Sequence, residues 1–421
     1  MIEYHQIIFS GAHGFDISVF QGIAHHDQAV TTTFDQKINA FHCLFTYIAS
    51  AHTKSHHHVQ TGYEDAAGLA ELARLCAAVT TEFENVSAHA LRWLSQFIPV
   101  SPSADCVAVT QDRIAEKALI RQAGLPTAPY LVLRRAADLE GELAPYLPGI
   151  LKTARFGYDG KGQRVVHTSQ EVAAAFGALA GLPSVLEKRL ELACELSVIV
   201  ARAASSEVAV FPAIENRHAR GILDVSILPA RVPAELARRA QRQAIELAVA
   251  LDYVGVLAVE FFVLPSGELI VNELAPRPHN SGHATLEACR TSQFEQQVRA
   301  LCGLPLGSPE LLRSAVMVNL LGELWERDGT PPDWECVLRV PAARLRLYGK
   351  DSARPGRKMG HYCVLARDCE SALRAAESIK QQLLARASSG ARPLLQGEDA
   401  DADAADPGST GFGEVIHHRP S

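Results

Sequence analysis

Residues 255–273 read GVLAVEFFVLPSGELIVNE, and this stretch decides the fold. Its first half is a largely apolar run rich in valine and phenylalanine, which predicts a buried strand, and the PSGE that follows predicts a turn before a returning strand. A tight turn centred between Ser266 and Gly267 brings Glu260 directly opposite Glu273, with both side chains on the same face. The sequence therefore predicts a β-hairpin that carries two facing carboxylates.

The facing glutamates need an explanation, because like charges directly opposite each other destabilise a strand pair. The repulsion costs about 1 kcal/mol in water and several times more at a lower effective dielectric constant. A divalent cation between the carboxylates removes this cost, and oxygen ligands together with the neighbouring Asn272 suit Mg²⁺ that is shared with substrate phosphates. The alternative is an ordinary hairpin whose glutamates are solvated or paired with arginine.

Composition places limits on the class of protein. The chain has 421 residues, of which 48% are hydrophobic and 21% charged, enough for about two or three globular domains. Its net charge of -7 argues against a general binder of nucleic acid or of anionic membranes. The nine cysteines include no CxxC pair, no apolar run is long enough to span a membrane, and the N-terminus lacks a signal-peptide pattern. We therefore expect a cytoplasmic protein with no nucleic-acid or membrane partner.

The chain begins with a segment that differs from the rest. Residues 1–62 are rich in histidine, threonine and phenylalanine, have no clear helical or alternating period, and contain no Gly-rich strand-to-helix turn. The apolar spacing then predicts a helix at 65–75, a short strand at 77–81 and a second helix at 86–97. The strand delivers Glu82 at its C-terminal end, where open α/β sheets place ligand sites.

Beyond these elements the chain divides into three further sections. A helix at 112–123 opens a long α+β section that ends near residue 302. From about residue 388 the chain is acidic and poor in apolar residues, so we expect this tail to be disordered. Between them lies a smaller, mostly β section, with strands expected at 314–322, 337–348 and 360–365 before a helix at 370–387.

A Gly-rich loop follows an apolar stretch in the α+β section. Residues 156–163 read FGYDGKGQ, and the absence of Cβ atoms at its glycines lets backbone N–H groups approach phosphate oxygens. Lys152 and Lys161 add positive charge. The loop has neither the ending of a Walker A loop nor the spacing of a dinucleotide fingerprint. It is either a phosphate-binding loop or a plain hairpin turn.

The segment 184–190, SVLEKRL, predicts a strand that runs into a connector. An edge strand exposes backbone N–H and C=O groups that can read the edge of an adenine ring. Glu195, a few residues further on, is placed to hold ribose hydroxyl groups. A structural salt bridge at Glu195 is an equally good interpretation of the sequence.

Two polar clusters lie farther along the chain. Residues 273–283, ELAPRPHNSGH, start at the end of the returning strand, and Arg277, His279 and Asn280 offer donors to an anion there. Residues 348–361, YGKDSARPGRKMGH, form a basic patch in an otherwise acidic chain. The alternatives are a capped loop for the first cluster and a solvated surface for the second.

Together these motifs resemble the 5-(carboxyamino)imidazole ribonucleotide synthase family, the ATP-grasp enzymes of purine biosynthesis that use bicarbonate. The resemblance runs in order from about residue 64 to about residue 384, and rests on GYDGKGQ at 157–163, AVE at 258–260, NELAPRPHNSGH at 272–283 and RPGRKMGH at 354–361. It implies an α/β fold of α+β subdomains, the ATP-grasp fold, with ATP and Mg²⁺ held between two of them. A truncated or altered Rossmann-like domain precedes this fold, and a small, mostly β domain follows it.

The resemblance also divides the chain into parts. These are an atypical segment without a family match at 1–62, the remainder of the Rossmann-like domain at 63–104, the ATP-grasp domain at 105–305, the β-rich domain at 306–387 and the acidic tail at 388–421. Family members begin with a strand and a Gly-rich turn of the type GGGQLG, and nothing in residues 1–62 matches it. These residues are either an out-of-frame or misassigned start or a genuine replacement. The strand at 77–81 is then expected to lose a neighbour and expose an edge.

Roles for individual residues follow from the resemblance as well. It implies that the nucleotide contacts are Arg113, Lys152, Gly157, Tyr158, Asp159, Gly160, Lys161, Gly162, Gln163, Glu187, Lys188, Arg189, Leu190, Glu195, His218, Asn272 and Glu273. It implies that the Mg²⁺ ligands are Glu260 and Glu273. The side that holds the ribonucleotide and bicarbonate comprises Glu82, preferred over its near neighbour Glu84, with Tyr158, Arg277, His279, Asn280, Lys350 and Arg357. The implied catalytic residues are Arg277, which clamps bicarbonate or carboxyphosphate, His279, which orients the amine or accepts its proton, and Lys350.

The implied function is the ATP- and bicarbonate-dependent carboxylation of 5-aminoimidazole ribonucleotide by way of carboxyphosphate, carried out by a homodimer. Two alternatives stay open at this point. One is an ATP-grasp ligase that uses formate or another acid, and the other is a nucleotide-binding protein inactivated by its altered N-terminus.

Overall fold

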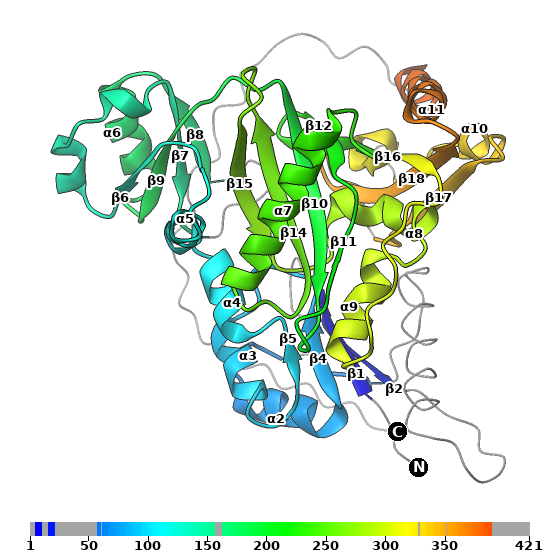
Figure 1. Cartoon of the computed structure of the whole chain (residues 1–421), viewed down its shortest axis with the longest axis horizontal. Helices are drawn as coiled ribbons and strands as arrows, with labels where there is room; N and C mark the ends of the chain where they lie inside the picture. The colour runs from blue at the N-terminus through cyan, green and yellow to red at the C-terminus, as the bar shows by residue number, and fades with distance from the viewer. Residues whose placement is uncertain are drawn as a thin grey trace, which may run out of the picture.

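The computed structural model describes residues 5–10, 16–21, 57–59, 61–155, 162–326, 329–350 and 352–389. The acidic tail from residue 390 and most of the Gly-rich loop lie outside these ranges. Within them three sheets organise the molecule, and Figure 1 shows the largest at the centre, a small one to its left and the N-terminal one below. No helix in the described ranges combines the length and the apolar character that crossing a membrane requires.

The N-terminal sheet joins strands from both sides of residue 62, in the order β3-β2-β1-β4-β5. β1 runs parallel to β4, and β5 pairs with the other side of β4. The expectation that the strand at 77–81 exposes an edge is therefore wrong, because both of its edges are paired. The elements of this part are β1 (His5–Ser10), β2 (Asp16–Gln21), β3 (His57–His58), α2 (Ala66–Leu75), β4 (Ala78–Thr81), α3 (Ala88–Leu94), β5 (Val100–Ser101) and α4 (Ala104–Thr110).

The first helices begin at side chains that cap them. Asp65 accepts a hydrogen bond from the Ala67 amide at the start of α2, and Ser87 accepts one from the Ala90 amide at the start of α3. In α2 the leucines whose spacing predicts the helix are buried: Leu69, Leu72 and Leu75. Helix α2 therefore packs with the face that the sequence pattern indicates.

A four-stranded antiparallel sheet forms the small subdomain, in the order β6-β9-β7-β8, with α6 beside it (Figure 1). β9 pairs with β6 on one side and with β7 on the other. The expectation that this strand exposes an edge for adenine is therefore wrong, because β6 occupies the edge in question. The elements are α5 (Arg113–Gln122), β6 (Tyr130–Leu133), β7 (Gly149–Thr153), β8 (Gln163–Val166), α6 (Ser169–Ala178) and β9 (Ser184–Lys188).

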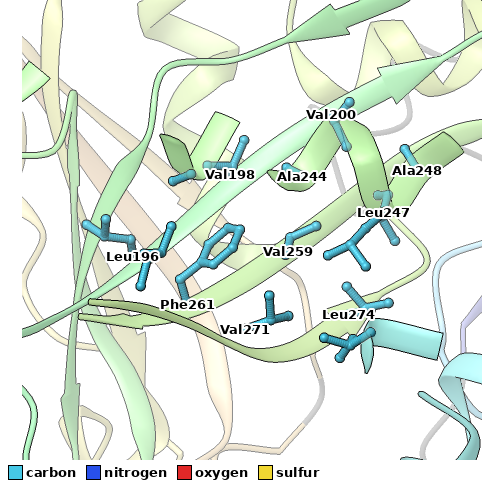
Figure 2. Close-up of a cluster of buried hydrophobic side chains, with 14 of the residues drawn as sticks. Leu196, Val198, Val200, Ala244, Leu247, Ala248, Val259, Phe261, Val271 and Leu274 are labelled. Atoms are coloured by element: carbon cyan, nitrogen blue, oxygen red, sulfur yellow. The ribbon is translucent and has the colours of Figure 1, made fainter. Parts of the chain in front are cut away.

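The large sheet carries the carboxylate hairpin at one end, in the order β15-β14-β10-β12-β13-β16-β18-β17, and β11 pairs with β10 beside this path. Its first elements are β10 (Cys194–Arg202), β11 (Val208–Val210), β12 (Ile214–Ala219), β13 (Ile222–Leu228), α7 (Ala234–Ala250), β14 (Gly255–Val263), β15 (Leu269–Ala275), α8 (Thr285–Ala288) and α9 (Gln293–Leu301). Helix α7 covers one face of the hairpin strands and β10. Figure 2 shows the apolar side chains that this contact buries, among them Ala244, Leu247, Ala248, Val198, Val200, Val259, Phe261 and Val271.

The C-terminal strands continue the same sheet, because β13 pairs with β16. The domain boundary expected between residues 305 and 306 therefore does not divide the sheet. The strand expected at 337–348 is shorter than predicted, since Pro341 lacks the N–H that a ladder needs and the strand begins after it. The elements are β16 (Ser314–Leu321), α10 (Glu335–Leu338), β17 (Ala343–Leu347), β18 (Lys358–Ala366) and α11 (Cys369–Ser389).

Candidate functional site

The β14–β15 hairpin places its two carboxylates as the sequence predicts, with Glu260 in register with Glu273. The turn differs from the predicted one, because the loop holds three residues, Pro265 to Gly267. The amide of Leu264 donates to the Glu268 carbonyl across this loop, at 2.9 Å, and the amide of Gly267 donates to the Leu264 carbonyl, at 2.8 Å. Gly267 adopts the left-handed conformation that such a loop needs, with φ +80°. A β-bulge then leaves Asn272 as the extra residue and restores the pairing of the two glutamates.

The two carboxylates meet different neighbours. Glu273 Oε2 lies 3.2 Å from Arg113 Nη1, whereas Glu260 Oε1 lies 3.4 Å from His279 Nε2. Burial and the charge of Glu273 raise the pKa of Glu260 to about 8. Burial acts to raise the pKa of Glu273 too, but Arg113 and Lys152 outweigh it and hold that pKa below its usual value. In the free protein near neutral pH one carboxylate is therefore charged and the other holds a proton.

Beside the hairpin, two lysines share one buried glutamate. Lys152 Nζ on β7 lies 3.0 Å from Glu187 Oε2, and Lys117 Nζ on α5 lies 3.2 Å from Glu187 Oε1. Burial acts to raise the pKa of Glu187, but the two lysines lower it to about 2. Glu187 is therefore ionised near neutral pH, and it holds the Nζ atoms of Lys117 and Lys152 close together beside β7.

Helix α5 ties this group to the hairpin. Glu116 accepts a hydrogen bond from the Leu274 amide at 2.6 Å, next to Glu273 on β15. Burial raises the pKa of Glu116 to about 8. Glu116 and Lys117 were not predicted as site residues from the sequence. Their spacing was a usable signal, because they stand three and four residues after Arg113, on the same face of the helix.

Arg277 connects the loop after β15 to the N-terminal sheet. Its Nη2 lies 2.9 Å from Glu84 Oε2, and its Nη1 donates to the Pro278 carbonyl at 3.1 Å. Burial raises the pKa of Glu82 to about 7, and the charge of Arg277 opposes that rise. The C-terminal end of β4 and the loop after the carboxylate hairpin therefore meet at Arg277.

The loop after Arg277 is held by side-chain hydrogen bonds. His279 Nδ1 lies 2.9 Å from Ser281 Oγ, and the amide groups of Asn280 and Asn319 bond each other in both directions, at 3.0 and 2.6 Å. Burial and the charge of Arg277 lower the pKa of His279 well below its usual value, so the imidazole is neutral. The loop continues as the 3₁₀ turn η3 (Asn280–Ala284), which leads into α8.

Glu195 and His218 form an ion pair on neighbouring strands. His218 Nδ1 lies 3.1 Å from Glu195 Oε2. Burial acts to lower the pKa of His218, but Glu195 outweighs it and raises that pKa above its usual value. The structural salt bridge that the sequence left open for Glu195 is therefore present.

The basic patch between β17 and β18 is folded back on its own backbone. Lys350 Nζ donates to the Lys358 carbonyl at 2.7 Å, and Arg357 Nη1 donates to the Ser352 carbonyl at 2.7 Å. Beneath Lys350, the hydroxyl of Tyr348 lies 2.8 Å from His361 Nδ1. The His361 ring in turn lies 5.1 Å from that of His283, at the end of the η3 loop, so the patch and this loop are neighbours.

The structure describes only some residues of the expected nucleotide site. Gly157, Tyr158, Asp159, Gly160 and Lys161 lie outside the described residues, whereas Gly162 directly precedes β8 and Gln163 is its first residue. The amide of Lys188 donates to the Pro129 carbonyl and that of Arg189 to the Pro148 carbonyl, both at 2.9 Å. These two amides are therefore already bonded within the protein, and Leu190 follows them half-buried.

Three family models match the chain. The ATP-grasp domain matches residues 118–294, the phosphoribosylaminoimidazole carboxylase C-terminal domain matches 315–375, and the ribonucleotide synthetase preATP-grasp domain matches 37–111. The third match begins inside the segment 1–62, for which the sequence predicted no family match. The ATP-grasp match covers the small sheet and the carboxylate hairpin, and the C-terminal match covers β16, β17 and β18 of the same large sheet.

Named relatives agree with these matches. The N5-carboxyaminoimidazole ribonucleotide synthase of Bacillus subtilis is 43% identical over 300 residues, which cover 71% of this chain and 78% of the relative. The enzyme of the same name from Brucella melitensis is 44% identical over 310 residues, covering 72% of this chain and 83% of the relative.

Solved structures show the same likeness. The ADP complex of an N5-carboxyaminoimidazole ribonucleotide synthetase superposes with a TM-score of 0.71 at 41% identity, covering 78% of this chain and 86% of that one. The Aspergillus clavatus N5-carboxyaminoimidazole synthase, in complex with ADP and 5-aminoimidazole ribonucleotide, superposes with a TM-score of 0.70 at 31% identity, covering 80% and 88%. By domain matches, sequence identity and fold, the chain belongs to the N5-carboxyaminoimidazole ribonucleotide synthase family of ATP-grasp enzymes.

Proposed function

We propose that this chain carries out the ATP- and bicarbonate-dependent carboxylation of 5-aminoimidazole ribonucleotide to 5-carboxyaminoimidazole ribonucleotide in purine biosynthesis. The γ-phosphoryl group of ATP passes to bicarbonate, which gives carboxyphosphate and ADP. Carboxyphosphate breaks down to CO₂ and phosphate, and the exocyclic amine of the ribonucleotide captures the CO₂. The observation that carries the proposal is the position of Arg277, which joins the end of β4 to the loop that follows the carboxylate hairpin.

The nucleotide side of the proposed site lies between β7 and the hairpin. Lys152 and Lys117, oriented by Glu187, supply positive charge for the phosphates of ATP. Glu260 and Glu273 are the residues that would hold Mg²⁺, because a cation between them offsets the repulsion that otherwise keeps a proton on one carboxylate. When bound, Mg²⁺ would neutralise negative charge on the phosphates. The remaining proposed nucleotide contacts, which support this assignment through the family resemblance, are Arg113, Gly157, Tyr158, Asp159, Gly160, Lys161, Gly162, Gln163, Lys188, Arg189, Leu190, Glu195, His218 and Asn272.

The substrate side lies around Arg277. Its guanidinium group clamps bicarbonate or carboxyphosphate, since a planar fork of donors matches a carboxylate or phosphate. Glu82 and the basic residues Lys350 and Arg357 hold the ribonucleotide, the latter two through its phosphate. Tyr158, His279 and Asn280 complete this side, and Lys350 joins Arg277 and His279 as a catalytic residue. The neighbourhood of the basic patch and the η3 loop supports this arrangement.

Product analysis with labelled acids tests the proposal. We expect ADP release that depends on the ribonucleotide and on bicarbonate, together with label from bicarbonate in the carboxylated product. Label from formate, with none from bicarbonate, would support a ligase that uses a different acid. ATP binding without ADP release would show that the chain binds nucleotide but does not turn over.

We also propose a homodimer, which the family resemblance implies. Sedimentation velocity at the concentrations used for activity measurements distinguishes a dimer from a monomer. A monomer that turns over at its full rate would contradict this part and leave the proposed reaction intact.

A further inference from the structure

A row of buried polar side chains crosses the large sheet beside the carboxylate hairpin. Ser197 of β10 is in register with Glu260 of β14, and Asn216 of β12 is in register with Ser226 of β13. Ser197 and Ser226 are fully buried, and Asn216 is 5% exposed. The residues on either side of Ser197 belong to the core beneath α7, so Ser197 faces the opposite side of the sheet, toward the loop that carries His279.

Four hydrogen bonds connect this row to His279. They run from Ser226 Oγ to Asn216 Oδ1 at 2.9 Å, from Asn216 Nδ2 to Ser197 Oγ at 2.9 Å, from Ser197 Oγ to Ser281 Oγ at 2.8 Å and from Ser281 Oγ to His279 Nδ1 at 2.9 Å. Ser281 is also fully buried. These four side chains form the polar row: Ser226, Asn216, Ser197 and Ser281. Because buried polar groups without partners are costly, each member is expected to use its donor and its acceptor within the row.

The direction of the hydrogen bonds follows from the end at His279. The backbone N–H of Ser281 lies 3.4 Å from His279 Nδ1, and a backbone N–H can only donate. Nδ1 therefore accepts and carries no proton, so the Ser281 hydroxyl donates to it as well. The Ser281 oxygen then accepts from Ser197, whose own oxygen accepts from the Asn216 amide N–H. This leaves Asn216 Oδ1 to accept from Ser226, and the hydrogen bonds that join the members of the polar row all run toward His279.

We propose that the polar row holds His279 in the tautomer protonated at Nε2, so that His279 donates a hydrogen bond to an anionic oxygen held beside Glu260. His279 Nε2 lies 3.4 Å from Glu260 Oε1, so its proton points into the carboxylate site. The identity of the anion, bicarbonate or carboxyphosphate, rests on the proposed function. The members of the polar row are positioning residues, because they act on the substrate only through His279.

This role replaces the expectation that His279 accepts the proton of the amine. A neutral imidazole accepts a proton only at its unprotonated nitrogen, and in His279 that nitrogen faces the buried polar row rather than the substrate side. A preorganised donor aimed at developing negative charge stabilises a transition state without reorganisation. The polar row thus assigns His279 to the electrostatic part of catalysis.

Nitrogen NMR of protein labelled with ¹⁵N in its histidines tests the tautomer without any substrate. The His279→Gln variant assigns the His279 signals by their disappearance. In the wild type we expect Nδ1 to resonate as an unprotonated nitrogen and Nε2 as a protonated one. In Ser281→Ala we expect the two resonances to approach each other, because the hydroxyl donor is lost and only the longer bond from the backbone N–H of residue 281 still favours this tautomer. A wild-type His279 with its proton on Nδ1, or with averaged resonances, would overturn the proposal.

Initial rates with ATP, bicarbonate and the ribonucleotide test the consequence. We expect Ser281→Ala and Ser197→Ala to lower kcat by roughly tenfold and to leave the KM for ATP unchanged, because a misplaced donor weakens transition-state stabilisation and not nucleotide binding. Ser184→Ala is the matched control, since Ser184 is fully buried and its hydroxyl donates to the Leu182 carbonyl. It should retain the kcat of the wild type.

The outcomes separate the two proposals. Equal losses of kcat and of ATP affinity in the polar-row variants would mean that the polar row serves only the fold, and the inference would fall. A kcat within twofold of the wild type in Ser281→Ala would overturn it as well. A wild type that forms no carboxylated ribonucleotide would refute the proposed function, while the NMR measurement would still decide the tautomer.

Discussion

Glu260 and Glu273 face each other, and their neighbours make them unequal. Arg113 compensates the charge of Glu273, whereas Glu260 meets the neutral imidazole of His279. A proton on Glu260, whose pKa is raised to about 8, removes the repulsion between the two groups in the free protein. In the proposed site a divalent cation would take over the role of that proton. The like-charge pair is therefore compatible with a folded free protein, because a proton neutralises one of its members.

Glu273→Gln removes one of the two carboxylates with little change of shape. We expect ribonucleotide-dependent ADP release to fall by about 100-fold or more, since charge stabilisation at the phosphoryl group is the main contribution to such reactions. In thermal unfolding, ATP with Mg²⁺ should stabilise the wild type relative to the free protein by about 2.7 kcal/mol at ~100 times its Kd, as mass action sets, and ATP alone should stabilise it less. The variant should lose the part that depends on Mg²⁺.

Glu268→Gln is the matched control for this prediction, because Glu268 lies exposed on the turn of the same hairpin. It should keep both the activity and the stabilisation by Mg²⁺. A Glu273→Gln protein that behaves like this control would remove Glu273 from the list of metal ligands.

The stability of the free protein should depend on pH through Glu82. Burial raises the pKa of this carboxyl from 4.5 to about 7, so the folded state keeps a proton that the unfolded chain releases between these values. The contribution of Glu82 to stability is therefore fully present below pH 4.5 and is lost as the pH rises through about 7. In Glu82→Gln this loss should disappear, so the melting temperature of the variant should fall less than that of the wild type between the two pH values. Parallel pH profiles for the two proteins would contradict the assignment.

Kinetics with the same variant also separate Glu82 from its neighbour. If Glu82 holds the ribonucleotide, Glu82→Gln should raise the KM for the ribonucleotide more than Glu84→Gln does. Glu84 instead pairs with Arg277, so its removal should act on bicarbonate. The reverse order of the two effects would exchange the roles of these glutamates.

The hairpin shows how far an element can be predicted from sequence. Alternation and turn residues predicted that Glu260 faces Glu273, and this is correct. The route was wrong, because a three-residue loop and a bulge at Asn272 together give the register that a shorter loop was expected to give. A bulge depends on what lies beside the strand. Here the flanking contacts come from α5 and from the bridge between Thr127 and Val271, which the sequence of the hairpin does not contain.

The connection between β17 and β18 carries the basic patch, and its function can be tested by removing charge. Lys350→Ala and Arg357→Ala should each raise the KM for the ribonucleotide by roughly tenfold or more, because a charge-assisted contact to phosphate contributes about 1.5 kcal/mol or more. The KM for ATP should change much less.

Arg344→Ala on β17 is the matched control for Arg357, since Arg344 is an exposed arginine that likewise donates to backbone carbonyls. It should leave both KM values unchanged. Equal increases of the two KM values in Lys350→Ala and Arg357→Ala would mean that the patch serves ATP or the fold.

Across the whole molecule, the sequence predicted the parts better than their connections. Motifs that are local in sequence, such as the carboxylate hairpin and the η3 loop, were identified from residue types alone. The polar row was not, because Ser197, Asn216 and Ser226 are ordinary strand residues until β10, β12 and β13 lie side by side. The same reason explains the edge wrongly expected at β4 and the wrong position of β9: strand neighbours distant in sequence leave no local pattern.

The N-terminal strands complete the sheet to which β4 belongs. β1 pairs in parallel with β4, the strand that directly precedes Glu82 of the proposed substrate side. Deletion of residues 1–59 should therefore leave the N–H and C=O groups on one side of β4 unpaired, which favours aggregation and lowers the melting temperature. ATP with Mg²⁺ should still stabilise the shortened chain, because α5, β7 and the carboxylate hairpin stay intact. Turnover of the ribonucleotide should fall, since the position of Glu82 depends on β4.

Deletion of residues 390–421 is the control, because the acidic tail contains none of the proposed site residues. This chain should keep the melting temperature and the turnover of the full-length protein. If the chain without residues 1–59 also melts at the temperature of the full-length protein, stays monodisperse and turns over the ribonucleotide at the full rate, then the pairing of β1 with β4 contributes nothing to stability. In that case the geometry around Glu82 is set by β5 and by the ion pair between Glu84 and Arg277.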